Sequence, residues 1–191
     1  MNGFDESFVL RASGTIVRCC IELGLSHPKP ALLPDVPRIF AFAIEMLLLL
    51  AAASATEQEL KILRDSVSLS AEQIADAHAI GMKEPDRVRL LCVETVLRST
   101  QPQLRATCDA INFFTLATLG LTLGYGTFIG LDRWGDRLLV VHEFADVSQC
   151  ERLGGILPFL RRYLFECLTI GYAAAPLELE ANALTARVCV E

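Results

Sequence analysis

Apolar side chains recur every three or four positions along much of the first half of the chain, which is the spacing of one face of an α-helix. Residues 5–23 follow this spacing and precede Gly24, a residue type that commonly ends helices. Four prolines within 26–37 predict a loop. Residues 39–55 are apolar nearly all round, so we expect a buried helix that runs on toward Asp65 with a break near 54–56.

Capping signals predict the next helices. Ser70 and Gln73 have the spacing of a capping box, and the helix that they open is expected to end at Gly81. Pro85 is suited to the first turn of another helix, which stops before a fifth helix over 102–123.

The pattern changes after Gly124. Residues 125–134 and 137–144 are rich in β-branched and aromatic side chains, and the Gly135-Asp136 pair between them is typical of a tight turn. These features predict a β-hairpin with His142 and Glu143 on its second strand.

A long helix is expected over 149–170, and alternating polarity predicts two short strands over 177–182 and 186–191. The predicted fold class is therefore α+β, with helices packed on one face of a small antiparallel sheet. We expect one domain over 1–191, with 26–69 as a helical elaboration.

Composition raises the question of a membrane. The chain of 191 residues is 52% hydrophobic and 21% charged, slightly more apolar than the average soluble domain. However, the apolar run Ile39–Ala55 is short for a membrane span and carries Glu45 near its middle, where a carboxylate is costly. We interpret the run as a buried helix or a surface covered by a partner, and expect peripheral membrane association at most.

Charge and cysteine content narrow the function classes. Seventeen Lys and Arg against 23 Asp and Glu give a net charge of -6, which disfavours a nucleic-acid partner. The seven cysteines contain no C-x-x-C pair and lie in or beside apolar runs, which favours reduced, buried cysteines and a cytoplasmic location.

Catalytic motifs are scarce. The chain contains no H-E-x-x-H, no G-x-S-x-G and no Walker lysine. His142 precedes Glu143, but on a strand the two side chains point to opposite faces and form no dyad. A pair of His142 with Cys150 or Cys167 has no spacing signature, and we expect no catalytic residues, no cofactor and no metal.

Three segments of the second half carry a family resemblance. They are GTFIGLDRWGDRLLVVHEF, LGGILPFLRRYLFECLTIG and PLELEANALTARVCVE. Their predicted order of hairpin, helix and strands resembles the small subunits of the transport protein particle (TRAPP) vesicle-tethering complex and the related 4-vinyl reductase-type domains. The resemblance covers 70–191 and, more loosely, 5–24.

The TRAPP-like branch implies a non-catalytic subunit in ER/Golgi transport. Such a subunit pairs with related small subunits in a hetero-oligomer, and the assembled complex engages a small GTPase. The expected interface side chains lie on helical faces around 39–55 and 85–119 and are Phe42, Leu47, Leu50, Val88, Leu91 and Phe114. The family resemblance also suggests one candidate for acylation, Cys108.

Three alternatives stay open. The 4-vinyl reductase branch implies a sensor that binds a small apolar ligand; of its zinc ligands only Glu180 and Cys189 have counterparts here. Residues 10–85 resemble the short–long–short helices of a histone-fold transcription subunit. An enzyme with an unsignalled His/Cys site is the third.

Overall fold

The computed structural model describes residues 36–94, 96, 102 and 119–190. The chain divides into two compact units, Met1–Leu50 with Arg98–Leu116, and Ala51–Leu97 with Ala117–Glu191. In the first unit the description covers residues 36–50 and 102, so the helix predicted over 5–23 and most of the one over 102–123 lie outside it. That the chain forms a single domain stays a prediction.

Helix α2 spans Val36–Asp65 without interruption. This confirms the apolar helix and its extension to Asp65, whereas the break expected near 54–56 does not occur. Glu45 is exposed to solvent. Among the residues that the structure describes, no helix is both long and apolar enough to cross a membrane.

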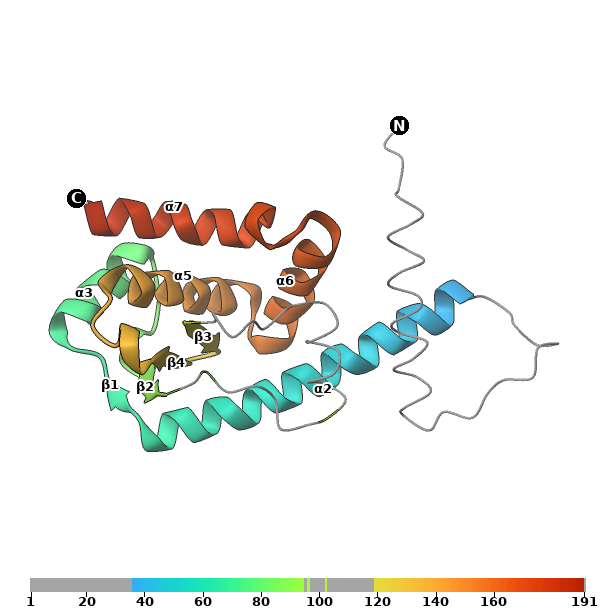
Figure 1. Ribbon diagram of the computed structural model, residues 1–191, viewed down its shortest axis with the longest axis horizontal. Helices are drawn as coiled ribbons and strands as arrows, with labels where there is room; N and C mark the ends of the chain where they lie inside the picture. Colours follow the sequence, from blue (N-terminus) through green and yellow to red (C-terminus); the bar gives the residue numbers. More distant parts are fainter. Residues whose placement is uncertain (1–35, 95, 97–101, 103–118, 191) are drawn as a thin grey trace. The chain divides into compact units, whose positions relative to one another are not determined.

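The sheet has four strands in the order β1-β2-β4-β3 (Figure 1). They are β1 (Val67–Ser68), β2 (Arg89–Val93), β3 (Gly120–Leu123) and β4 (Gly126–Gly130). The β1–β2 and β3–β4 pairs are antiparallel, but β2 and β4 are parallel, so the sheet is mixed rather than antiparallel.

The α+β class is confirmed, but helices cover both faces of the sheet in the second unit. Neighbouring residues of a strand point to opposite faces. Accordingly Leu90 and Ile129 pack with side chains of α3, α5 and α7, while Leu91 and Phe128 pack with Ile62 of α2. The prediction that helices pack on one face was therefore wrong.

Local capping chemistry was read correctly. Helix α3 (Ala71–Ile80) begins with the capping box of Ser70 and Gln73 and ends at Gly81, whose φ of 99° is left-handed. The following segment differs from the prediction. A short 3₁₀ helix, Pro85–Arg87, leads into β2, because Leu90 and its neighbours complete the sheet.

The hairpin of the structure lies earlier in the chain than the predicted one. Strands β3 and β4 form it, and the turn uses Gly124, whose φ of 63° suits glycine. Residues 120–123 were expected to end the helix predicted over 102–123, but they form strand β3. Asp136 is not a hairpin turn residue; its side chain accepts the amide of Leu139 as the N-cap of α5.

Helices α5 (Arg137–Leu153) and α6 (Ile156–Ile170) replace the second predicted strand and the single long helix. Between them Gly154 and Gly155 have φ values of 93° and 118°, which ends one helix and turns the chain. Helix α7 (Pro176–Val190) replaces the two predicted C-terminal strands. Figure 1 shows α7 running alongside α5, and the two helices are in contact.

Candidate functional site: a buried histidine–carboxylate cluster

Helix α5 places three ionisable side chains within little more than one turn. His142 and Asp146 are four residues apart and therefore share a face of the helix, and Glu143 follows His142 directly. The helix begins at its Asp136 cap, and Val140, Val141 and Phe144 anchor it in the core. Because these apolar neighbours pack in the core, the polar side chains between them lie in the interior as well.

Helix α7 contributes the fourth member of the cluster, Glu178. Its side chain is only 3% exposed, and its Oε2 atom lies 3.5 Å from Nε2 of His142. The hydroxyl of Tyr163 on α6 donates to Oε1 of Glu178 at 2.5 Å. We call His142, Glu143, Asp146 and Glu178 the acidic cluster.

Strand β3 holds Glu143 in place. The Thr122 hydroxyl donates to Oε2 of Glu143 at 2.7 Å. Gly120 leaves the space that this carboxylate occupies, since a Cβ atom at Gly120 would lie 2.2 Å from Oε1 of Glu143. Glu143 is therefore fixed by one hydrogen bond and by a close approach that only glycine permits.

Asp146 is the least satisfied member. Its Oδ1 atom is buried and has no hydrogen-bond partner. Buried polar atoms normally have partners, and an orphaned one in a polar cluster is consistent with a site for a water or an ion. Burial and the charge of Glu143 raise the pKa of Asp146 well above its usual range.

The other members have shifted pKa values as well. Burial raises the pKa of Glu143 to about 7, against the opposing effects of the Thr122 hydrogen bond and of His142. Burial lowers the pKa of His142, but the hydrogen bond to Glu178 and the charges of Asp146 and Glu143 outweigh it, so this pKa is about 9. Burial also raises the pKa of Glu178, yet its hydrogen bonds with His142 and Tyr163 bring it below the usual value.

A set of hydrogen bonds fixes the start of α7 against α5 and α6. The Gln149 side chain donates to the Leu177 carbonyl at 2.9 Å and to Oε2 of Glu180 at 3.2 Å. The Leu177 amide donates to Glu166 at 2.8 Å, and Arg162 donates to the other oxygen of Glu166. Glu178, the next residue after Leu177, is thereby held beside His142.

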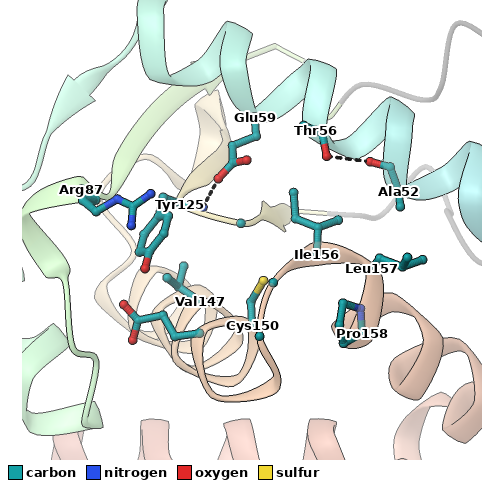
Figure 2. A pocket seen from close by; sticks show the side chains of 14 residues that line it. Ala52, Thr56, Glu59, Arg87, Tyr125, Val147, Cys150, Ile156, Leu157 and Pro158 are labelled. Atoms are coloured by element: carbon teal, nitrogen blue, oxygen red, sulfur yellow. Dashed lines mark hydrogen bonds between the residues drawn. The ribbon is translucent and has the colours of Figure 1, made fainter.

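A second polar region is a pocket of about 480 Å³ between α2, the β3–β4 turn and the α5–α6 junction. Figure 2 shows that Glu59 reaches the turn, where its Oε1 atom accepts the Tyr125 amide at 2.8 Å. The Arg87 guanidinium lies 3.9 Å from the centre of the Tyr125 ring. Cys150 lines the pocket, but burial raises the pKa of its thiol to about 12, so it is a poor nucleophile.

As their side chains lie, no three of the described His, Cys, Asp and Glu residues could hold a metal ion. The acidic cluster gathers suitable donor types in one buried place without a shared centre. The cluster contains one histidine, His142, and two carboxylates that are candidate metal ligands, Asp146 and Glu178. Its fourth member, Glu143, is held by the Thr122 hydroxyl.

No protein-family model, no curated protein and no solved structure matches this chain.

The residues predicted for an interface differ in their exposure to solvent. Leu47 and Leu50 are half-buried on α2, and Leu91 is half-buried on β2. Val88 is fully buried in the core of its own chain. Leu47 and Leu50 belong to the first unit and Val88 and Leu91 to the second, and their interface role stays a prediction.

The remaining predicted residues fall partly outside the described residues. Phe114 and Cys108 lie outside the described residues, and of Phe42 only the backbone, within α2, is described. Glu180 and Cys189, the counterparts of a zinc site, both lie on α7, where Glu180 pairs with Arg152 at 2.6 Å.

The acidic cluster was missed for two reasons. His142 and Glu143 were noticed but assigned to a strand, which would separate them. In addition, a strict search for H-E-x-x-H rejects a sequence with aspartate at the last position. A search for H-E followed three residues later by any metal-binding side chain would have found H-E-F-A-D.

Proposed function

We propose that the protein is a metal-dependent hydrolase that cleaves amide bonds in peptides. Because no three described donors share a centre as they lie, His142, Asp146 and Glu178 would hold the metal ion only after their side chains rotate, and Glu143 would then be the general base. The observation that carries the proposal is the meeting of a helical histidine–carboxylate pair with a glutamate of another helix in a buried place where one carboxylate oxygen has no partner.

The sequence pattern supports this assignment. In H-E-x-x-H zinc peptidases, the first and last residues lie one turn apart on a helix and bind the metal, while the glutamate between them acts as general base. A third ligand comes from another element and is a glutamate in one class of these sites. Here α5 supplies H-E-F-A-D and α7 supplies Glu178.

Charge compensation supports it as well. Glu143, Asp146 and Glu178 act on one another in a buried region, with His142 as the basic group among them. Carboxylates gathered in a low-dielectric interior are costly unless a positive charge offsets them. A divalent cation supplies this charge, and it takes the place of the proton on His142.

For the three side chains to share one metal ion, they would have to rotate from the positions that they have in the structure. Cβ atoms one helical turn apart are about 5–6 Å from each other, a distance that metal–ligand bonds of about 2 Å span. His142 and Glu178 are already within 3.5 Å of each other. Asp146, whose Oδ1 atom has no partner, gives up no hydrogen bond at that atom when it turns toward them.

The chemistry follows from these positions. A divalent ion held by His142, Asp146 and Glu178 would supply polarisation of the scissile carbonyl and of the attacking water. Glu143 takes a proton from this water, whose oxygen bonds to the carbonyl carbon. Glu143 then passes the proton to the amide nitrogen as the C–N bond breaks, which leaves a carboxylic acid and an amine. A base with a pKa of about 7 is well matched to this task near neutral pH.

Tyr163 is a positioning residue. Its hydroxyl donates to Oε1 of Glu178 and leaves Oε2 to face His142. Such outer partners orient metal ligands, and their loss typically weakens metal affinity about 10- to 100-fold.

The test compares three proteins in metal binding and in hydrolysis of an unfolded protein such as casein. After removal of metal and addition of one divalent ion at a time, the natural chain should bind one ion and cleave casein. Glu143→Gln should still bind the ion but lose activity by about 10²- to 10⁴-fold. Glu178→Gln should lose both. A chain that binds no divalent ion in equilibrium dialysis contradicts the proposal.

The resemblance to small TRAPP subunits suggests a second candidate, a non-catalytic subunit of an assembly at the ER or Golgi. In its support, Phe165 and Ile170 on α6 are 68% and 53% exposed, as expected of side chains that a partner covers. Co-purification from cells with related small subunits, lost in Phe165→Ser, would favour this function. Recovery of the chain alone would count against it.

A further inference from the structure

The pocket of Figure 2 is large enough for a small molecule. Its volume of about 480 Å³ lies within the range of about 300–1,000 Å³ that small-molecule sites occupy. All of its lining residues belong to the second unit, and none of them belongs to the acidic cluster. We propose that this pocket binds a small organic cation with an apolar body, such as an alkyl or aryl amine. Such binding does not depend on the proposed hydrolase.

One part of the pocket is apolar. Ile156 and Leu157, at the start of α6, are half-buried, and Pro158 beside them is exposed. Val147 contributes from α5 and Ala52 from α2. Figure 2 shows Ile156 and Val147 on different sides of the same hollow. An alkyl chain or aromatic ring placed against these side chains is removed from water, which favours its binding.

Another part of the pocket is acidic. Glu59 and Glu151 lie at the two polar ends of Tyr125, since Oε1 of Glu59 accepts its amide at 2.8 Å and its hydroxyl donates to Glu151. Glu151 also accepts the backbone amides of Lys83 and Glu84. All of these donors are neutral. They therefore provide hydrogen bonds to the two carboxylates without cancelling their negative charges.

The charge balance of the lining favours a cation. Arg87 also lines the pocket, but its guanidinium pairs with Oε2 of Glu84 at 2.7 Å. The effect of the acids is felt at the pocket wall: burial raises the pKa of the Cys150 thiol to about 12, and the charges of Glu59 and Glu151 add to the rise. A site with this field attracts a positive ligand more strongly than a neutral or negative ligand of the same shape.

An ammonium group on an apolar body matches both parts of the pocket. Each carboxylate can accept more hydrogen bonds than the backbone amides supply, and an ammonium offers several N–H donors. An organic anion would meet two carboxylates, and an inorganic cation would leave the apolar side chains exposed to water. The side chain of a lysine in a peptide has the same chemistry as a free alkylamine, so the test includes both sources.

The experiment titrates the full chain with three probes that share one apolar body: phenylbutylamine, phenylbutanol and phenylbutyrate. Shifts of assigned amide resonances in NMR spectra give each Kd and locate the site. The amine should bind with a Kd of about 1 mM, as expected for a ligand of its size. The alcohol should bind about fivefold more weakly, and the acid most weakly of the three. The largest shifts should fall on Gly124, Gly154 and Gly155, which line the pocket.

Three variants assign the two parts of the pocket. Glu59→Gln keeps an acceptor for the Tyr125 amide but removes the charge, so it should weaken amine binding about fivefold and leave the alcohol unchanged. Glu57→Gln is the matched control, because Glu57 is an exposed residue of α2 outside the pocket and loses the same charge. Leu157→Ala should weaken the amine and the alcohol alike by about fourfold, the contribution of one buried methylene group.

Equal binding of the three probes would overturn the proposal, as would equal amine affinities of Glu59→Gln and Glu57→Gln. Shifts confined to residues outside the pocket would show adventitious binding only and would overturn it too. The comparison of probes on the natural chain decides the matter even if a variant does not fold. A short blocked peptide with a central lysine is titrated in the same way, and the tighter binder of amine and peptide identifies the source of the cation. Neither metal binding nor casein cleavage enters these measurements, so failure here leaves the hydrolase intact.

Discussion

Two polar regions of the second unit differ in how their charges are satisfied. In the pocket of Figure 2, Glu59 accepts a backbone amide and Arg87 stacks on Tyr125. Glu151, which also lines it, accepts the amides of Lys83 and Glu84 at 2.8 and 3.0 Å. In the acidic cluster, by contrast, burial and the charges of Glu143 and Glu178 raise the pKa of Asp146, whose Oδ1 atom has no hydrogen-bond partner.

The pocket of Figure 2 is therefore the weaker candidate for the proposed chemistry, because its charged groups already have hydrogen-bond partners. The charged groups of the pocket tie turns and loops together and are used by the fold itself. In the acidic cluster burial raises the pKa values of Glu143 and Asp146, and buried groups with shifted pKa values are candidates for a functional site. Four predictions test this contrast, in order of decreasing effect.

The largest effect is expected from Gly120→Ala. The new methyl group would lie 2.2 Å from Oε1 of Glu143 and must displace that carboxylate. Misplacing a catalytic group by about 1 Å can cost about 100-fold in rate, so casein cleavage should fall by that order while metal binding persists. Gly135→Ala is the matched control, because nothing lies within 4 Å of its added Cβ. Equal activity of the two variants would show that Glu143 is not the base.

Metal should stabilise the cluster and not the pocket. At a metal concentration 100 times the Kd, binding adds about 2.7 kcal/mol to the free energy of unfolding. For a chain of this size, that gain in free energy raises Tm by about 5–11 °C. The measurement compares thermal melts of the protein with metal and with chelator. Glu178→Gln should abolish the shift and Glu59→Gln should keep it. The reverse result would place the metal in the pocket.

The Gln149 side chain should matter through its hold on α7. Gln149→Leu keeps the size of the residue but leaves the Leu177 carbonyl without this donor, which should cost about 1–3 kcal/mol in a urea unfolding curve. Arg152→Ala breaks an exposed pair with Glu180 and should cost at most about 1 kcal/mol. Similar losses in the two variants would argue that Gln149 does not position α7.

The smallest effect is expected in the pocket. Arg87→Ala removes an exposed cation from the Tyr125 ring, worth about 0.5–1 kcal/mol in the same unfolding experiment. Metal affinity and casein cleavage should not change. A loss of activity would connect the pocket to the acidic cluster and remove the contrast between them.

Local signals predicted the elements that local chemistry decides. Helix α3 was read from Ser70, Gln73 and Gly81, because the capping box and the left-handed stop act within a few residues. Helix α2 was read from its long apolar run. In both cases the chain segment itself contains the interactions that define the element.

The errors arose where distant contacts decide. Residues 137–144 are rich in β-branched and aromatic side chains, yet they form a helix because Val140, Val141 and Phe144 pack on the sheet at helical spacing. The alternation in 177–182 is real, but Glu178 and Glu180 point to partners on α5 and α6 rather than to solvent.

For the same reason only half of the site was visible in the sequence. His142 and Glu143 are adjacent and were noticed. Glu178 lies 36 positions after His142, and no spacing rule connects the two. Their meeting depends on the packing of α7 against α5, which periodicity alone does not predict.

The two left-handed glycines between α5 and α6, Gly154 and Gly155, decide where the side chains of α6 lie. A straight helix advances about 1.5 Å per residue, so an unbroken rod from Cys150 would carry Tyr163 about 20 Å onward, far from α7. The reversal at Gly154 and Gly155 folds that length back, and Tyr163 reaches Glu178 instead. The turn at these two glycines thus determines which side chain of α6 reaches Glu178.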